Sequence, residues 1–235
     1  MGVGVTSSLL CDVRRLIMID FTKIQDSIPY ILEGIPVLFQ VVIVAAIAGM
    51  LIGIVVAALK ITKSRFLRFI GHAYTAIFRG TPLILQLAIV HFGLPQLTGY
   101  VTTGYQSAII AFSLNSGAYI SEIIRAGIQA VDRGQWEAAD ALGISYFKQL
   151  RSIILPQAFK NILPAIMNEL ITLTKESALV STVGVLDVMR RAQIVGGEKA
   201  IYFEPLLFAG FVYFVLVMGL SLIGQQVEKA MRKSG

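Results

Sequence analysis

Residues 36–59 read PVLFQVVIVAAIAGMLIGIVVAAL and contain no charged side chain. Because about 20 apolar residues are enough for a helix to cross a bilayer, this stretch predicts a membrane-spanning helix. The whole chain fits the same class. Of its 235 residues, 56% are hydrophobic and 14% are charged, against about 25% charged in soluble domains. We therefore expect an all-α integral membrane protein.

Four further stretches are long and apolar enough to cross a membrane. The five predicted spans are residues 36–59, 78–97, 105–127, 162–185 and 205–224. All of them belong to one predicted transmembrane domain, residues 35–227. The other predicted segments are an external or interfacial N-terminal segment, a cytoplasmic loop and a cytoplasmic tail, at residues 1–34, 128–160 and 228–235.

Basic side chains lie mainly between the predicted spans. Segments rich in Lys and Arg fall at residues 60–68, 133–160 and 229–233, and with five spans all three lie on one side. Since cytoplasmic segments carry an excess of Lys and Arg, we expect the N-terminus outside and the C-terminus in the cytoplasm. This distribution accounts for the net charge of +6 without a nucleic-acid partner. A basic group at residues 190–199 is an exception, because it falls in the predicted external loop.

Disulfide, metal and hydrolytic motifs are not found in the sequence. Cys11 is a single cysteine, and no metal-ligand spacing surrounds His72 or His91. The spans carry no H-E-x-x-H, paired-aspartate or Ser/His/Asp pattern. We therefore expect a transport protein and not an enzyme.

Three predicted spans carry polar side chains on one helical face. In span 162–185, one stripe of about a third of the helix circumference holds Asn168, Glu169, Thr172, Lys175 and Glu176 at 3.6 residues per turn. Polar groups at membrane depth are costly unless they face a protein interior or a watery cavity, so these faces predict a solute pathway. Glu169 is the strongest candidate, because its helix has no cation three or four residues away. The candidate substrate-binding residues are Arg79, Gln86, Asn115, Ser116, Tyr119, Glu122, Asn168, Glu169 and Thr172.

Several of these polar residues also have a purely structural interpretation. Glu122 could pair with Arg125 three residues later. Arg79 could extend to the cytoplasmic interface. For Lys175 and Glu176 we favour an ion pair that fixes helix packing over a role in substrate binding.

The predicted cytoplasmic loop contains the amphipathic segment EAADALGISYFKQLRSIILP at residues 137–156. Gly143 permits a turn between two short helices, and Pro156 starts or kinks the helix that follows. The second short helix is expected to have an apolar face formed by Phe147, Leu150, Ile153 and Ile154, and a polar face formed by Lys148, Gln149, Arg151 and Ser152.

The residues of this segment have a specific spacing: EAA, three residues, G, nine residues, I, one residue, LP. This resembles the EAA loop of permease subunits of binding-protein-dependent ABC importers, with every fixed position present. In that family the loop is a coupling helix that docks into a groove of the ATP-binding subunit. The resemblance therefore implies a docking role for Glu137, Ala138, Ala139, Gly143, Ile153, Leu155 and Pro156.

Three other stretches resemble the polar amino acid branch of this family. They are FRGTPLILQL at residues 78–87, AYISEIIRAGIQAVDRGQWEAADALG at 118–143 and NELITLTKESALVSTVGVLDV at 168–188. The resemblance implies import of a polar amino acid across a bacterial inner membrane, with alternating access driven by ATP hydrolysis on a partner. A basic substrate, meaning arginine, lysine or histidine, is favoured, and glutamine or another polar amino acid is the alternative.

The expected partners follow from the same resemblance. The chain has no G-x-x-x-x-G-K-[ST] loop, so ATP and magnesium are expected on a dimer of ATP-binding subunits and no cofactor on this chain. An extracytoplasmic amino-acid-binding protein, a second permease copy or close homologue, and membrane lipid complete the expected partners. A self-sufficient secondary transporter, which would need its own coupling-ion site, is a more remote alternative.

Overall fold

The structure is a computed structural model that describes residues 19–233, and within this range it contains helices and connecting turns but no strand. Residues 1–18 of the predicted N-terminal segment and the last two residues of the predicted tail lie outside the described range. Two elements are 3-10 helices (η1 and η4) and two are π-helices (η2 and η3). In chain order the elements are η1 Phe21–Ser27, α2 Ile28–Leu32, α3 Gly34–Ile61, α4 Arg65–Gly80, α5 Leu83–Ala88, η2 Ile89–Gly93, α6 Leu94–Thr98, α7 Gly104–Gln129, α8 Arg133–Ala141, α9 Tyr146–Gln149, η3 Leu150–Ile154, α10 Leu155–Glu176, η4 Ser177–Val183, α11 Val188–Lys199 and α12 Phe203–Lys233.

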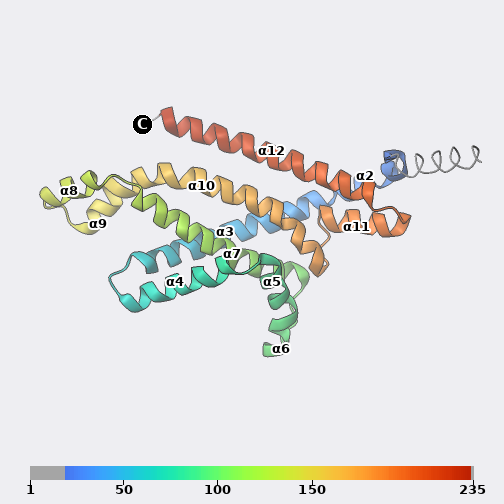
Figure 1. The fold of residues 1–235 in the computed structure, drawn as a ribbon, viewed down its shortest axis with the longest axis horizontal. Helices are drawn as coiled ribbons and strands as arrows, with labels where there is room; N and C mark the ends of the chain where they lie inside the picture. Colours follow the sequence, from blue (N-terminus) through green and yellow to red (C-terminus); the bar gives the residue numbers. More distant parts are fainter. Residues whose placement is uncertain (1–18, 234–235) are drawn as a thin grey trace, which may run out of the picture.

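The long helices run roughly along one axis, and the two ends of the bundle differ (Figure 1). At one end, here called the loop end, lie α8, α9 and the C-terminal part of α12. At the other, here called the α11 end, lie α2 and α11. The predicted cytoplasmic loop therefore projects from the molecule at the end opposite α11.

The long apolar helices agree with three predicted spans. By length and composition the described residues contain three helices able to cross a membrane, Phe21–Ile61, Gly104–Gln129 and Phe203–Met231, and a fourth if one bent helix pair counts as a single span. These three contain the predicted spans 36–59, 105–127 and 205–224. The predicted span 162–185 falls in α10 and η4, and α10 is not among the helices that meet the same criterion.

The predicted span 78–97 is not one straight helix. It begins at the end of α4 and continues after a break through α5, η2 and α6, and the two halves meet at 101°. Gly80 and Pro82 flank the break, as expected for residues that interrupt helices. This bend turns α5 and α6 away from the bundle (Figure 1).

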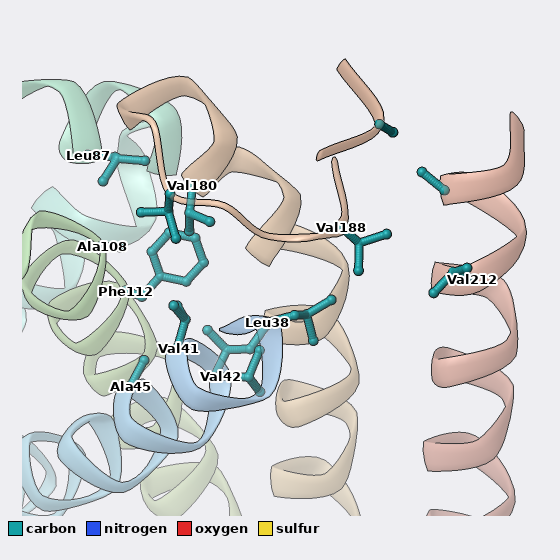
Figure 2. Packing of buried hydrophobic residues seen from close by; sticks show 14 of the residues in the cluster. Leu38, Val41, Val42, Ala45, Leu87, Ala108, Phe112, Val180, Val188 and Val212 are labelled. Carbon is teal, nitrogen blue, oxygen red and sulfur yellow. The ribbon is translucent and has the colours of Figure 1, made fainter. Parts of the chain in front are cut away.

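The hydrophobic core lies toward the α11 end. Figure 2 shows Leu38, Val41 and Val42 of α3 close to Phe112 of α7, and all four are at most 1% exposed. Residues from η4, α11 and α12 join the same cluster. This packing holds α3 and α7 at the centre of the bundle.

Small residues bring α3 and α7 into close contact. A methyl group added at Gly53 would lie 2.6 Å from the Ile120 side chain, and one at Gly117 would lie 2.6 Å from Ile52. Glycine at both positions lets the two helix backbones approach closely, which places α7 firmly beside α3.

Charged side chains join the N-terminal segment to α11. Arg191 Nη1 donates to Glu33 Oε2 at 2.8 Å, and Lys199 Nζ donates to Asp26 Oδ1 at 2.6 Å. Two cations that depart from the expected charge asymmetry are thus neutralised by acids of the N-terminal segment. These ion pairs explain why two basic side chains occur in a segment that was predicted to be external.

Candidate functional site

A cavity of about 330 Å³ lies between α7 and α10. It brings together five of the nine predicted substrate-binding residues, because the polar faces of the two helices are turned toward each other. The lining residues are Asn115, Tyr119, Ile123, Ala165, Asn168, Glu169, Thr172 and Glu176.

The lining of this cavity contains two carboxylates and no cationic side chain. Glu169 and Glu176 both line it, and neither takes part in an ion pair within residues 19–233. A carboxylate in a poorly solvated place is costly unless a cation compensates it. The cavity therefore has the chemistry to receive a positively charged group.

The expected ion pair between Lys175 and Glu176 is wrong. Lys175 is exposed, whereas Glu176 faces the cavity. Successive residues of a helix point about 100° apart, so adjacent charges lie on different faces. The sequence placed Glu176 on the stripe of Glu169, seven positions earlier, but the preferred ion pair with Lys175 kept it out of the predicted site.

Gln86 does not line the cavity but supports a residue that does. Asn115 Nδ2 donates to Gln86 Oε1 at 3.1 Å and to the Phe78 carbonyl at 3.2 Å. Gln86 Nε2 donates in turn to oxygens around the break between α4 and α5. Gln86 thus joins the bend to the cavity wall.

Arg79 lies behind Tyr119 instead of in the cavity. Its guanidinium carbon is 5.2 Å from the centroid of the Tyr119 ring, within the range of a cation–π interaction. Its side chain is exposed on α4, so the structure places it as a neighbour of the cavity wall.

Glu122 belongs to an ion-pair cluster and not to the cavity. Its two carboxylate oxygens accept from Lys60 Nζ and Arg125 Nη2, each at 2.6 Å. The Lys60 side chain is fully buried and also donates to Ser121 Oγ at 2.9 Å. The structural interpretation of Glu122 is therefore the better one, and its assignment to substrate binding is corrected here.

Ser116 lies behind the cavity wall, against α3. A methyl group added at Gly49 would lie 3.0 Å from its Cβ. Its hydroxyl is buried without a hydrogen bond of good geometry and lies beside the Glu169 carboxylate. It is a neighbour of the cavity and does not line it.

The second candidate site is the loop formed by α8, α9 and η3. Gly143 has φ +67°, the left-handed conformation that glycine adopts without strain, so the predicted turn is present. Glu137 and Ala138 are exposed, and Ala139 is 1% exposed because it packs inside the loop. Ile153 is half-buried, whereas Leu155 and Pro156 are exposed.

The expected faces of the second loop helix need correction. Gln149, expected on the polar surface, is 2% exposed. Its Nε2 donates to Asp140 Oδ1 and to the Ile144 carbonyl, each at 2.6 Å, so it holds the turn together. Phe147, expected on the apolar face, is 71% exposed.

The loop exposes apolar side chains that the motif alone did not identify. Leu142 is 77% exposed beside the turn, and Trp136 stacks on Tyr146 with ring centroids 5.9 Å apart. A second cavity of about 660 Å³ adjoins α8, lined in part by Trp136 and Glu137. Exposed apolar groups next to charged ones are typical of protein interaction sites.

Comparison with known proteins gives concordant matches. The family described as binding-protein-dependent transport system inner membrane component matches residues 49–233. The chain is 53% identical over 216 residues to the arginine transport system permease protein ArtQ of Bacillus subtilis (strain 168), covering 92% of this chain and 99% of that protein. It is 50% identical over 209 residues to the putative glutamine transport system permease protein GlnP of Rickettsia conorii, covering 89% and 96% respectively.

Solved structures agree in fold. A crystal structure of an amino acid ABC transporter with histidines superimposes with a TM-score of 0.88 at 37% identity, covering 91% of this chain and 100% of that one. The MetNI methionine ABC transporter superimposes with a TM-score of 0.74 at 22% identity, covering 86% and 96%, which shows the fold alone.

Proposed function

Since the chain belongs to the family of binding-protein-dependent transport system inner membrane components, we propose that it is the permease subunit of an importer for basic amino acids. Family membership makes it a multi-pass membrane protein that works with an ATP-binding subunit. The proposal adds the substrate class, the residues that receive it and the arrangement of the partners.

The observation that carries the proposal is the acidic cavity between α7 and α10. Glu169 and Glu176 are seven residues apart on α10, so their Cα atoms are separated by about 10 Å along the helix. A basic amino acid has an α-ammonium at one end and a second cation at the other. One carboxylate for each cation leaves no charge of the cavity uncompensated.

Asn115, Tyr119, Asn168 and Thr172 complete a polar lining around the acids. These uncharged groups suit the α-carboxylate and the remaining N–H groups of an amino acid. Glutamine is the second candidate, because a relative that is 50% identical carries the name of a glutamine permease. Its α-ammonium could pair with Glu169, but Glu176 would then keep no cationic partner.

The proposed topology places the loop end in the cytoplasm. Lys60, Arg65, Arg133 and Lys148 lie in or beside the turns at that end, while Arg191 and Lys199 at the α11 end are paired with acids. This asymmetry supports an external N-terminus and a cytoplasmic C-terminus.

The partners are assigned to the two ends accordingly. The ATP-binding subunits, which carry ATP and magnesium, dock on the exposed loop formed by α8 and α9. An extracytoplasmic amino-acid-binding protein delivers substrate at the α11 end. A second permease copy or close homologue completes the pathway within the membrane.

The experiment is reconstitution of this chain with its ATP-binding subunit and binding protein in liposomes. ATP hydrolysis is measured with each amino acid in turn, and basic amino acids are expected to stimulate it most. Glu169→Gln should abolish the stimulation while leaving the complex assembled, because it keeps the volume and removes the charge. The matched control is Glu228→Gln, an exposed acid on α12.

Two results would contradict the proposal. The first is stimulation by neutral amino acids alone. The second is transport by Glu169→Gln with unchanged apparent affinity, which would make Glu169 a packing residue.

A further inference from the structure

We infer that Gln86 is a specificity-positioning residue: it fixes the orientation of the Asn115 amide so that the cavity presents a hydrogen-bond acceptor, and not a donor, to the substrate. The inference rests on the proposed function and concerns the same cavity. It assigns a selective role to a side chain that never touches the substrate.

The chain of hydrogen bonds starts at Thr81, in the break between α4 and α5. Thr81 Oγ1 donates its single hydrogen to the Ile77 carbonyl at 2.8 Å. Toward Gln86 this oxygen can therefore only accept. The direction of the next hydrogen bond is fixed by that donation.

Gln86 is held by three acceptors. The Phe78 carbonyl, the Thr81 carbonyl and Thr81 Oγ1 lie at 2.8, 3.1 and 2.9 Å from its Nε2. An amide oxygen turned toward three acceptors would be repelled by all of them, so the NH₂ group must point there. The opposite atom, Oε1, then faces Asn115. Gln86 is 7% exposed, so water cannot substitute for these partners.

The orientation of the Asn115 amide is fixed in the same way, by the partners of one of its two terminal atoms. The atom that it directs toward α5 meets Gln86 Oε1 at 3.1 Å and the Phe78 carbonyl at 3.2 Å. Both are acceptors, so this atom is Nδ2, and its two hydrogens are used. Among residues 19–233 no donor reaches Oδ1 of Asn115.

The acceptor left on Asn115 belongs to the lining that also holds Glu169 and Glu176. One amide oxygen and two carboxylates together favour a ligand group that carries only N–H donors, such as an ammonium or guanidinium. A neutral ligand that presents its own carbonyl would set acceptor against acceptor and leave both unpaired. Arginine and citrulline test this difference, because citrulline replaces the guanidinium by an uncharged ureido group of similar size.

The measurement is the ratio of arginine to citrulline affinity, determined by calorimetric titration of the permease–ATPase complex without the binding protein. The unaltered complex should bind arginine at least tenfold more tightly. Gln86→Met removes one of the two acceptors that hold Nδ2 and leaves only the Phe78 carbonyl. The Asn115 amide is then held less firmly in one orientation, so the ratio should fall by up to about fivefold, the effect of one hydrogen bond.

Three companion variants separate positioning from general damage. Asn115→Ala should lower the ratio by a similar factor, and the double variant with Gln86→Met should lower it no further, because both act through one group. Gln40→Met, a matched change at an exposed glutamine of α3, should leave the ratio unchanged.

Three results would each overturn the inference. The first is an unchanged ratio in Gln86→Met, and the second is a fall of the ratio in the double variant equal to the product of the falls in the two single variants. The third is equal affinity of the unaltered complex for arginine and citrulline. If Gln86→Met does not assemble, Gln86→Ala removes the same acceptor with a smaller side chain, and an unchanged ratio in that variant overturns the inference as well. A complex that binds no arginine would refute the proposed function itself. Arginine binding with a ratio insensitive to Gln86 would refute only this inference.

Discussion

The α11 end and the loop end of the molecule are closed in opposite ways. At the α11 end, segments more than 150 residues apart in the chain are joined: Arg191 pairs with Glu33, and Gly34 packs directly on the backbone of Val188. At the loop end, α8 and α9 leave Leu142 and Phe147 more than 70% exposed. The α11 end joins distant segments of the chain by ion pairs and close backbone packing, whereas the loop end leaves large apolar side chains without such contacts.

The ion pairs of the two ends differ as well. Glu33 is 65% exposed in its pair with Arg191, whereas Lys60 is fully buried in its pair with Glu122. Water screens the first pair and not the second. The same change of Glu to Gln should therefore have unequal consequences at the two ends.

Glu122→Gln is expected to have the largest effect on stability. It leaves the buried ammonium of Lys60 without a carboxylate, and breaking such a pair costs about 3 to 5 kcal/mol. Heat-induced unfolding of the purified chain in detergent measures the loss. A midpoint within a degree of the unaltered chain would show that Lys60 finds another partner, and would remove the contrast between the two ends.

Gly34→Val should come next. A Cβ at this position would lie 2.4 Å from the Val188 nitrogen and 2.5 Å from the Asp187 carbonyl carbon, and backbone atoms cannot move aside as a flexible side chain can. We expect a loss of about 1 to 3 kcal/mol in the same unfolding experiment. Gly219→Val is the control, because nothing lies within 4 Å of a Cβ there. Equal stability of the two variants would mean that the start of α3 and the start of α11 separate easily.

Glu33→Gln should have a small effect. The pair with Arg191 is exposed on its acidic side, and surface pairs contribute at most about 1 kcal/mol. Arg191 also keeps its bond to the Tyr30 carbonyl and its contact with the Tyr30 ring. The unfolding midpoint should shift less than in Glu122→Gln, and a larger shift would reverse the ranking of the two ends.

Phe147→Ser should change the stability of the isolated chain least, by less than about 0.5 kcal/mol, because its ring has few contacts to lose. Capture of the ATP-binding subunit should nevertheless fall about tenfold, as for an aromatic anchor at an interface. Copurification from detergent measures this. Phe203→Ser serves as the control, because the Phe203 side chain is 60% exposed and lies at the α11 end. Equal capture by both variants would mean that the exposed ring takes no part in docking.

The sequence predicted the helical class and much of the cavity. Asn115 and Tyr119 could be grouped on one helix, and Asn168 and Glu169 on another, because helical periodicity shows which side chains share a face. Periodicity does not show which neighbouring helix that face meets. Glu122 lies on the same stripe as Tyr119, yet it meets Lys60 of α3 and forms ion pairs.

The same limit explains the errors in the loop. Gln149 is buried because two acceptors happen to lie within reach of its amide, and no pattern of polar and apolar letters contains that information.

Glu176 was set aside because an adjacent lysine suggested a pair. Neighbours in sequence on a helix point in different directions, so seven-residue spacing from Glu169 was the better guide.

The joint between the loop and the membrane has a mechanical consequence. α9, η3 and α10 follow one another without a break from Tyr146 to Glu176, because the wider π turn, closed by the bond from Leu155 N–H to the Leu150 carbonyl, accommodates the missing N–H of Pro156. Phe147 at the tip and Glu169 in the cavity therefore lie on one continuous helical run, about 33 Å apart along its axis, with Pro164 between them. If this run tilts as one body about its tip, one degree shifts Glu169 by about 0.6 Å, so a few degrees of movement at the loop are enough to make or break a hydrogen bond in the cavity.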